Sequence, residues 1–155
     1  MKKFLATAAF VMAAFVAVPA AANEGRAEVR AGYLFAPGED QEVVGLALGY
    51  DFDLSDTLFA GLEVSGDKIL HSGSGITWGG SARLGTSLGE SARAYVIGGY
   101  TNSCDDCVDS YTAGAGAEYN LSEDVYLKAE YRHFFTTEGL EDFDAVLIGV
   151  GIAVE

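Results

Sequence analysis

Two cysteines and two histidines are the residues in this sequence best suited to carry out chemistry. Cys104 and Cys107 have the C-x-x-C spacing of redox motifs and of metal sites. A redox motif requires a βαβ context and a helix N-terminus that lowers the thiol pKa, and the surrounding sequence has no helical pattern. A zinc site needs about four ligands, so His71 and His133 would have to approach the cysteines. The spacing leaves a disulfide, a metal site and redox chemistry as three interpretations.

Acidic residues cluster in three polar segments that separate apolar runs. Ca²⁺ and Mg²⁺ prefer such oxygen ligands, and the clusters could bridge through divalent cations to anionic lipopolysaccharide headgroups or capture a basic partner. No Asp-x-Asp-x-Asp-Gly loop is present, so we expect solvated loops, with no metal ion and no cofactor. The clustered residues are Glu39, Asp40, Glu42, Asp105, Asp106, Asp109, Glu138, Glu141, Asp142 and Asp144.

Other charged residues recur at the two-residue period of an extended strand. Lys128, Glu130 and Arg132 are spaced by two, so one strand presents all three to the same side. Buried charges need partners of opposite sign, and both signs are present. We expect one charge network if these faces enclose a lumen. Its predicted members are Glu28, Arg30, Glu63, Arg83, Arg93, Glu118, Lys128, Glu130 and Arg132.

The N-terminal segment, residues 1–22, has the features of a secretory signal peptide. Two lysines precede an uncharged apolar run at residues 4–18, and Pro19 and three alanines lead to an expected cleavage site after Ala22. The run is shorter than the roughly 20 residues of a membrane-spanning helix, so we expect cleavage and not anchoring. In an exported chain an even cysteine pair is usually a disulfide, which favours a Cys104–Cys107 bond.

Residues 23–155 are expected to form a single domain with a strongly negative charge. They contain seven basic and 23 acidic residues, a formal net charge of −16. Phosphate binding requires Lys and Arg on a common face, so this composition excludes nucleic acid as a partner. Twenty glycines, eight tyrosines and nine phenylalanines in the full sequence are typical of a chain of many strands and turns.

The apolar pattern of this domain has the period of β-strands and shows no sustained helical period. Eight runs of twelve to fourteen residues can be counted, longer than the five or six residues usual in soluble domains and close to the roughly 9–11 of a transmembrane strand. The expected strands are Gly25–Ala36, Glu42–Asp53, Thr57–Lys68, Gly75–Leu88, Ser91–Asn102, Ser110–Leu121, Asp124–Phe135 and Phe143–Val154.

The connections between these runs alternate between two kinds. Three are tight and similar, with leucines at positions 54, 88 and 121 that mark a repeated hairpin unit. Four are longer or more polar, and are expected at 37–41, 70–74, 103–109 and 136–142. Short turns at one rim and longer loops at the other are typical of outer-membrane barrels. Both termini would then lie at the short-turn rim, in the periplasm.

The two faces of each run decide between a membrane barrel and a soluble sandwich or lipocalin-like binder. In the second run Val44, Leu46 and Leu48 share a face, opposite Gly45 and Ala47. A face of small or charged residues is a poor core for a soluble sandwich, but it suits the polar interior of a membrane barrel. Aromatic residues near the strand ends predict interfacial girdles: Tyr33, Phe35, Tyr50, Phe52, Tyr100, Tyr119, Tyr131 and Phe135.

The chain resembles the small eight-stranded outer-membrane barrels, the group that includes the OmpA membrane domain, OmpX and opacity-type proteins. The resemblance rests on stretches such as AGYLF, LALGYDFDLSDTLFAGLEV and SARAYVIGGYTN, and it covers residues 23–155. It implies a closed antiparallel up-and-down all-β barrel of about eight strands in the outer membrane. Such chains usually end in an aromatic residue, whereas this one ends in Val154 and Glu155.

The expected function is structural or surface-interacting, with no catalysis. The resemblance implies outer-membrane lipid and lipopolysaccharide as partners, and we expect a monomer with a side-chain-filled lumen. A narrow pore for small solutes is one alternative. A lipid A-modifying enzyme is another, but lipid A deacylases of this type look like His-x-Ser followed by a distant acid. Here Phe135 stands where the serine would follow His133.

Overall fold

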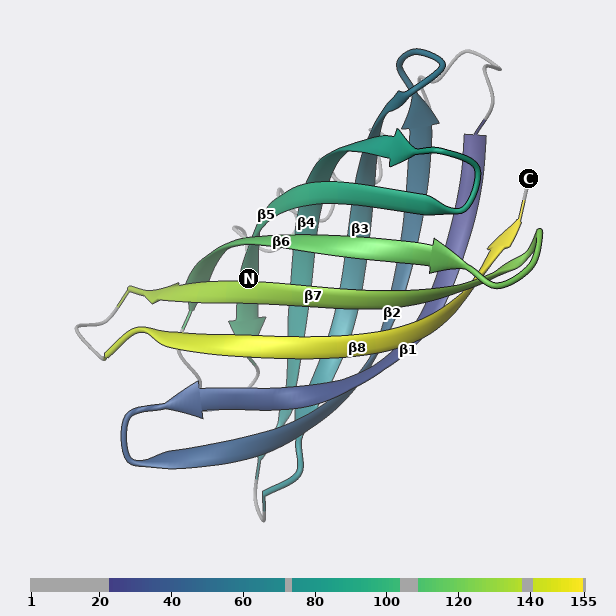
Figure 1. Ribbon diagram of the computed structural model, residues 1–155. Coiled ribbons are helices and arrows are strands. Elements are labelled where there is room, and N and C mark those ends of the chain that lie inside the picture. Colours follow the sequence, from purple (N-terminus) through teal and green to yellow (C-terminus); the bar gives the residue numbers. More distant parts are fainter. Residues whose placement is uncertain (1–22, 72–73, 104–108, 138–140, 155) are drawn as a thin grey trace, which may run out of the picture.

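Eight antiparallel strands form a closed barrel in the computed structural model (Figure 1), which describes residues 23–71, 74–103, 109–137 and 141–154. Each strand pairs with the next along the chain, and the last pairs with the first, so the sheet has no free edge. The strands are β1 (Asn23–Ala36), β2 (Glu39–Asp53), β3 (Leu58–Ile69), β4 (Ile76–Leu88), β5 (Ala92–Ser103), β6 (Ser110–Asn120), β7 (Val125–Thr136) and β8 (Phe143–Val154).

The expected all-β barrel class and the number of strands are confirmed, and most strand ends lie within two residues of the expected positions. The exception is the start of the second strand, because the expected longer connection at 37–41 was wrong. β2 begins at Glu39, and Ala36 pairs with Glu39 across a two-residue turn. Pro37 fixes its own φ, and Gly38 has a φ of +109°, which an L side chain rarely adopts. These two residues close the hairpin without a loop.

Two of the three tight connections at the other rim repeat one hydrogen-bonding pattern. Leu54 N donates to Leu58 O, and Leu121 N donates to Val125 O, both at 2.8 Å. In each turn a serine side chain accepts a backbone N–H at 3.1 Å, Ser55 from Leu58 and Ser122 from Val125. Gly25 near the start of β1 pairs with Val154 at the end of β8, so both ends of the barrel chain lie at this rim.

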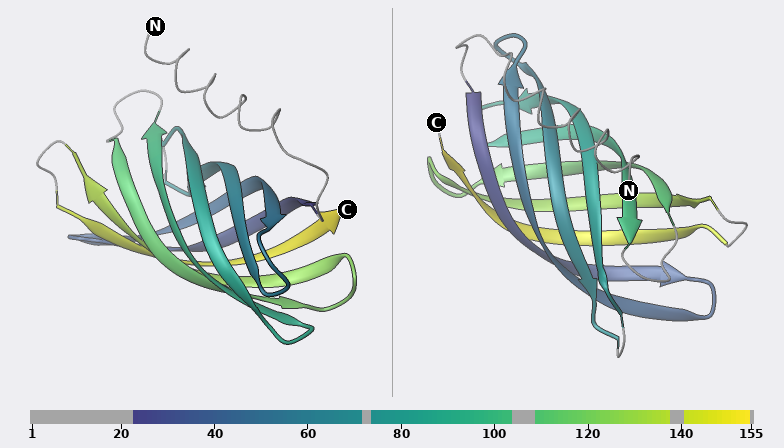
Figure 2. Two further views of the ribbon diagram at one scale, coloured as in Figure 1. Left: turned by 90° about the horizontal axis from the view of Figure 1, so that it is seen from above. Right: turned by 180° about the vertical axis from the view of Figure 1, so that it is seen from behind.

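The register gives the strands a strong tilt, visible in the three ribbon views (Figures 1 and 2). A row of directly paired residues that starts at Leu58 on β3 passes once round the barrel and returns to β3 at Lys68. The return point is ten residues further along the strand, which is the shear of this barrel. A row that runs directly across the strands therefore also descends the wall from one rim toward the other.

The two faces of the sheet differ in chemistry as the alternation predicts. Large apolar side chains such as Leu46, Leu48 and Ile148 are exposed on the outer wall. Charged and small residues lie on the inner face, where Arg83 and Arg132 are almost fully buried. Among the described residues there is no helix that is long and apolar enough to cross a membrane.

Candidate functional site: a charged lumen with an apolar cap

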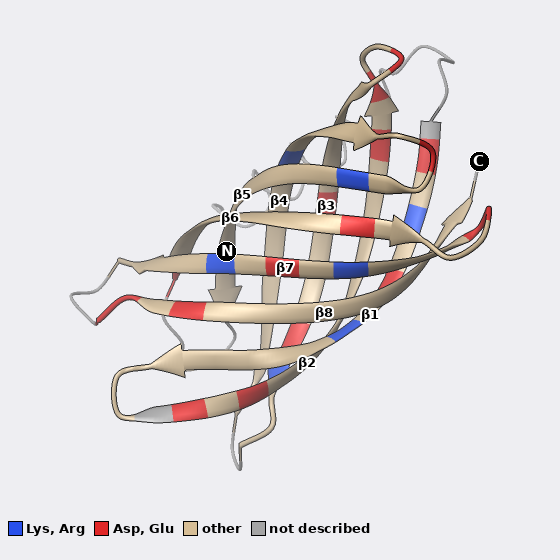
Figure 3. Ribbon diagram, viewed as in Figure 1, with Lys and Arg blue, Asp and Glu red and all other residues tan. Residues whose placement is uncertain are grey.

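Charged residues from seven strands converge inside the barrel, at positions that Figure 3 marks along the ribbon. Of the seven basic residues in the described part of the chain, six point into the lumen and only Lys68 is on the outer wall. The inward set is Arg26, Arg30, Arg83, Arg93, Lys128 and Arg132.

The layer nearer the short-turn rim is built round two arginines. Arg83 forms salt bridges with both Asp51 and Glu118. Arg26 shares these carboxylates, with Nε 3.2 Å from Asp51 Oδ2 and Nη1 3.5 Å from Glu118 Oε1. The Arg83 guanidinium also lies 5.0 Å from the ring centroid of Phe59, within the range of a cation–π contact. Each charge in this layer therefore contacts at least two partners.

The central layer is organised by one carboxylate. Glu63 lies within salt-bridge distance of four cations, which is why a buried carboxylate can remain charged there. The nitrogen–oxygen distances are 2.8 Å to Arg132, 3.1 Å to Arg30, 3.6 Å to Lys128 and 3.8 Å to Arg26.

Lys128 and Arg132 link the central carboxylate to further acids. Lys128 Nζ lies 2.7 Å from Glu28 Oε1, as an ion pair without hydrogen-bond geometry. Arg132 forms a salt bridge with Glu130, whose Oε2 accepts a hydrogen bond from the Tyr95 hydroxyl at 2.6 Å. The network thus includes neutral hydroxyl donors as well as charges.

Arg30 extends the network toward the longer-loop rim, and Arg93 extends it toward the short-turn rim. Arg30 donates two hydrogen bonds to Asp67, at 2.8 and 2.6 Å. Arg93 donates two to Glu24, at 3.2 and 2.9 Å. Paired donation of this kind is the strongest arrangement available to arginine and a carboxylate.

Beyond the charges, toward the longer-loop rim, part of the lumen is closed by an apolar cluster that we term the apolar cap. Its buried core is Leu34, Val43, Ala145 and Leu147, with Ile69, Phe134 and Phe143 packed against it. The rings of Phe134 and Phe143 stack with centroids 4.5 Å apart and planes 11° apart. The lumen therefore changes along its length from ion pairs to hydrocarbon.

The structure places all nine residues of the sequence-predicted network on the inner face. Eight are buried, and the side chain of Arg93 is 21 % exposed at the short-turn mouth. Sequence reasoning missed Arg26, although it continues the spacing of Glu28 and Arg30. It also left out five charged or hydroxyl residues that contact the network: Glu24, Asp51, Asp67, Tyr95 and Tyr126.

A second polar cluster lies on the outer face, near the longer-loop end of β7 and β8. His133 pairs with Asp144 across the two strands, with Nδ1 2.7 Å from Oδ1, and the Tyr131 hydroxyl donates to the same oxygen at 2.6 Å. His133 Nε2 lies 3.7 Å from Asp142 Oδ2. The Phe135 ring packs edge-on against the imidazole, with centroids 4.4 Å apart.

Part of the remaining candidate sites lies outside the residues that the structure describes. Cys104, Cys107 and the acidic residues 105, 106 and 138 lie outside the described residues, as does the expected signal peptide. Within the described ranges no group of three or more His, Cys, Asp and Glu residues is arranged to hold a metal ion.

Comparison with known families assigns the fold. Residues 6–153 match the model of the outer membrane protein β-barrel domain. The chain belongs to this family of outer-membrane β-barrels. Its location is therefore the outer membrane, as the strand lengths and the apolar outer wall predicted. No curated protein matches the chain.

Solved outer-membrane barrels of this size share the architecture. The N-terminal barrel domain of Pseudomonas aeruginosa OprF has a TM-score of 0.60 at 20 % identity, covering 83 % of this chain and 97 % of that one. Neisserial surface protein A gives 0.57 at 14 %, covering 85 % and 96 %. The outer membrane enzyme PagL gives 0.58 at 10 %, covering 82 % and 98 %. At such identities the likeness shows the fold alone.

Proposed function

We propose that this outer-membrane barrel is a structural, non-conducting and non-catalytic element of the cell envelope that acts as a monomer. The observation that supports this proposal is the filled lumen, in which ion pairs occupy the centre and the apolar cap covers part of the longer-loop end. An eight-stranded barrel has an interior just wide enough for side chains to fill. A rigid wall of this kind presents its outer face to lipid and its loops to the outside.

A closed lumen predicts the absence of ion current. The folded protein inserted into planar lipid bilayers is expected to give no conductance steps above the bare-membrane baseline. A folded barrel changes its gel mobility when it is boiled. This heat-dependent shift verifies that the inserted protein is folded. Reproducible, ion-selective steps from heat-shifting protein would contradict the closed lumen and favour the narrow-pore alternative.

Two observations favour the lipid A-modifying alternative: the outward His133–Asp144 pair, and the enzyme PagL among the similar structures. A nucleophilic mechanism needs a hydroxyl or thiol that the histidine can activate. The residue that follows His133 on the same face is Phe135, whose phenyl ring cannot act as a nucleophile. The Nε2 atom of His133 faces the carboxylate of Asp142. We therefore assign this cluster a structural role at the interface.

Mass spectrometry of lipid A from cells that express the protein tests this assignment. Lipid A is expected to be identical in cells with the wild-type protein, with His133→Ala and with empty vector. Loss or transfer of an acyl chain in the wild-type sample alone would establish catalysis and overturn the structural role.

A further inference from the structure

Lys68 is the one basic side chain that the described part of the chain places on the outer wall. It is exposed near the end of β3, at the longer-loop rim, and pairs across the sheet with Val44 on β2 and Ile76 on β4. The other six basic residues are used inside the barrel. Lys68 is therefore the single fixed positive charge that this wall offers to an anionic molecule in the membrane.

Lys68 stands at the upper end of a groove on the outer wall. A row of directly paired residues runs from Lys68 through Val44 and Ala31 to Ile148. Because the barrel is strongly sheared, this row also descends from the longer-loop rim into the apolar zone. Ala31 leaves a low point in the row between two larger side chains.

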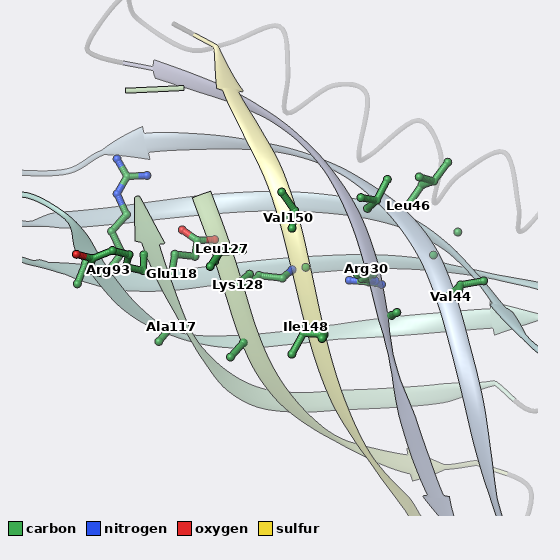
Figure 4. A pocket seen from close by; sticks show the side chains of 18 of the residues that line it. Arg30, Val44, Leu46, Arg93, Ala117, Glu118, Leu127, Lys128, Ile148 and Val150 are labelled. Atoms are coloured by element: carbon green, nitrogen blue, oxygen red, sulfur yellow. The ribbon is translucent and has the colours of Figure 1, made fainter. Parts of the chain in front are cut away.

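A second row lies parallel to the first, two residues nearer the short-turn rim. It runs from Gly66 through Leu46 and Val29 to Val150. An open hollow of about 1130 Å³ follows the two rows and continues past them to Ala117 on β6 (Figure 4), with Val44 and Leu46 on one strand and Ile148 and Val150 on another. We call this hollow the wall groove. Its exposed lining is almost entirely apolar.

We propose that the wall groove binds lipid A, with a phosphate on the Lys68 ammonium and an acyl chain along the two apolar rows. Charge complementarity selects the occupant, because a cation at the rim end of an apolar groove matches a phosphorylated headgroup above a hydrocarbon chain. A polybasic surface attracts anionic lipid nonspecifically, whereas here a single lysine fixes where the phosphate lies. The proposal rests on the membrane barrel and not on the closed lumen, so the conductance result does not affect it.

The neighbours of Lys68 are consistent with a phosphate at this place. The nearest outward carboxylate along β2 is Glu42, and it accepts a hydrogen bond from the Tyr33 hydroxyl at 3.4 Å. Tyr33 is on β1 and Lys68 is on β3, so this contact draws the carboxylate toward the side away from the lysine. Trp78, 57 % exposed, covers Gly66 beside the groove, a position suited to the membrane interface.

Binding can be followed by the fluorescence of Trp78, because it is the single tryptophan of the chain. In vesicles of brominated phosphatidylcholine its fluorescence is quenched by neighbouring lipid. Lipid A that occupies the wall groove displaces the brominated lipid and restores the emission. The folded full-length protein is titrated with lipid A in the presence of EDTA, which removes divalent bridging through the acidic loops.

The variants separate the charge from the groove. We expect Lys68→Gln to raise the lipid A fraction needed for half recovery about fivefold, the effect of one basic residue near anionic lipid, and Lys68→Arg to behave as wild type. Ala31→Phe, which fills the groove, is expected to weaken recovery as well. Ala82→Phe, on the outer face of β4 and not among the residues that line the groove, is the matched control and is expected to change nothing. Each variant is first shown to be folded by its heat-dependent gel shift.

Three outcomes would overturn the proposal. One is equal titration curves for wild type and Lys68→Gln. Another is equal recovery with dephosphorylated lipid A, which would leave the phosphate without a role. The third is recovery of the fluorescence only when EDTA is omitted, which would assign binding to cation bridges at the acidic loops. Inorganic phosphate alone is expected to give no recovery, and recovery with it would show that the site takes a free anion.

Discussion

Glu63→Gln is expected to destabilise the barrel by about 3–5 kcal/mol, the cost of breaking a buried ion pair by removing one partner. Glutamine preserves the size of the side chain and removes the charge. Four cations then lose the carboxylate that they share, and they repel one another in a medium of low dielectric constant. The measurement is the free energy of unfolding from urea titrations of the protein folded in lipid vesicles.

Two further variants make this result specific. Glu90→Gln makes the same chemical change on an exposed turn and is expected to alter the free energy of unfolding by less than about 0.5 kcal/mol. Glu63→Gln combined with Lys128→Met removes one of the unbalanced cations, and we expect it to recover part of the loss. Equal stability of wild type and Glu63→Gln would show that the four cations do not depend on Glu63 and that the other lumen carboxylates and water stabilise them.

Gly151→Val is expected to cost about 3 kcal/mol, at the upper end of the usual range for overpacking a filled interior. A Cβ at position 151 would lie 2.2 Å from Cζ of Tyr126, which is paired directly across from it on β7. The Tyr126 ring is only 3 % exposed and is held by Arg26 and Glu28. It therefore has no free space to move into.

The control for this prediction is a glycine on the outer wall. A Cβ at Gly80 would meet no atom within 4 Å, so Gly80→Val is expected to be neutral or stabilising, since valine favours strands. Tyr126→Leu is expected to relieve the clash, so a double-mutant cycle with Gly151→Val should show coupling. Urea unfolding in vesicles measures all four proteins. Equal losses at positions 80 and 151 would mean that backbone freedom, and not crowding, explains the effect.

The charge network also explains the surface of the protein. Because six of the seven described basic residues are inside, the exposed acidic residues of the loops and turns have few basic neighbours on the outer surface. Lys68 is therefore the one outward basic side chain of the described residues. This uneven distribution is why a single residue can set the lipid preference that we propose.

Much of the barrel could be predicted from the sequence because a strand is a local pattern. The alternation of apolar and small residues depends only on neighbours along the chain, so it identified eight strands and both faces of each. The repeated turns at Leu54 and Leu121 were visible for the same reason. The Pro37–Gly38 turn was misjudged because the acidic residues that follow it resemble a loop. In the barrel these residues belong to β2 and pair with β1.

Only the tertiary structure decided which charges meet. Arg26 and Glu118 are 92 residues apart, and Arg132 and Glu63 are 69 apart. Their contacts follow from the register of the strands and from the shear accumulated round the barrel, and neither quantity is encoded in a local pattern. The same holds for the wall groove, whose rows cross strands taken from both ends of the chain. The sequence by itself determined which side chains face inward or outward, and closure of the barrel determined their partners.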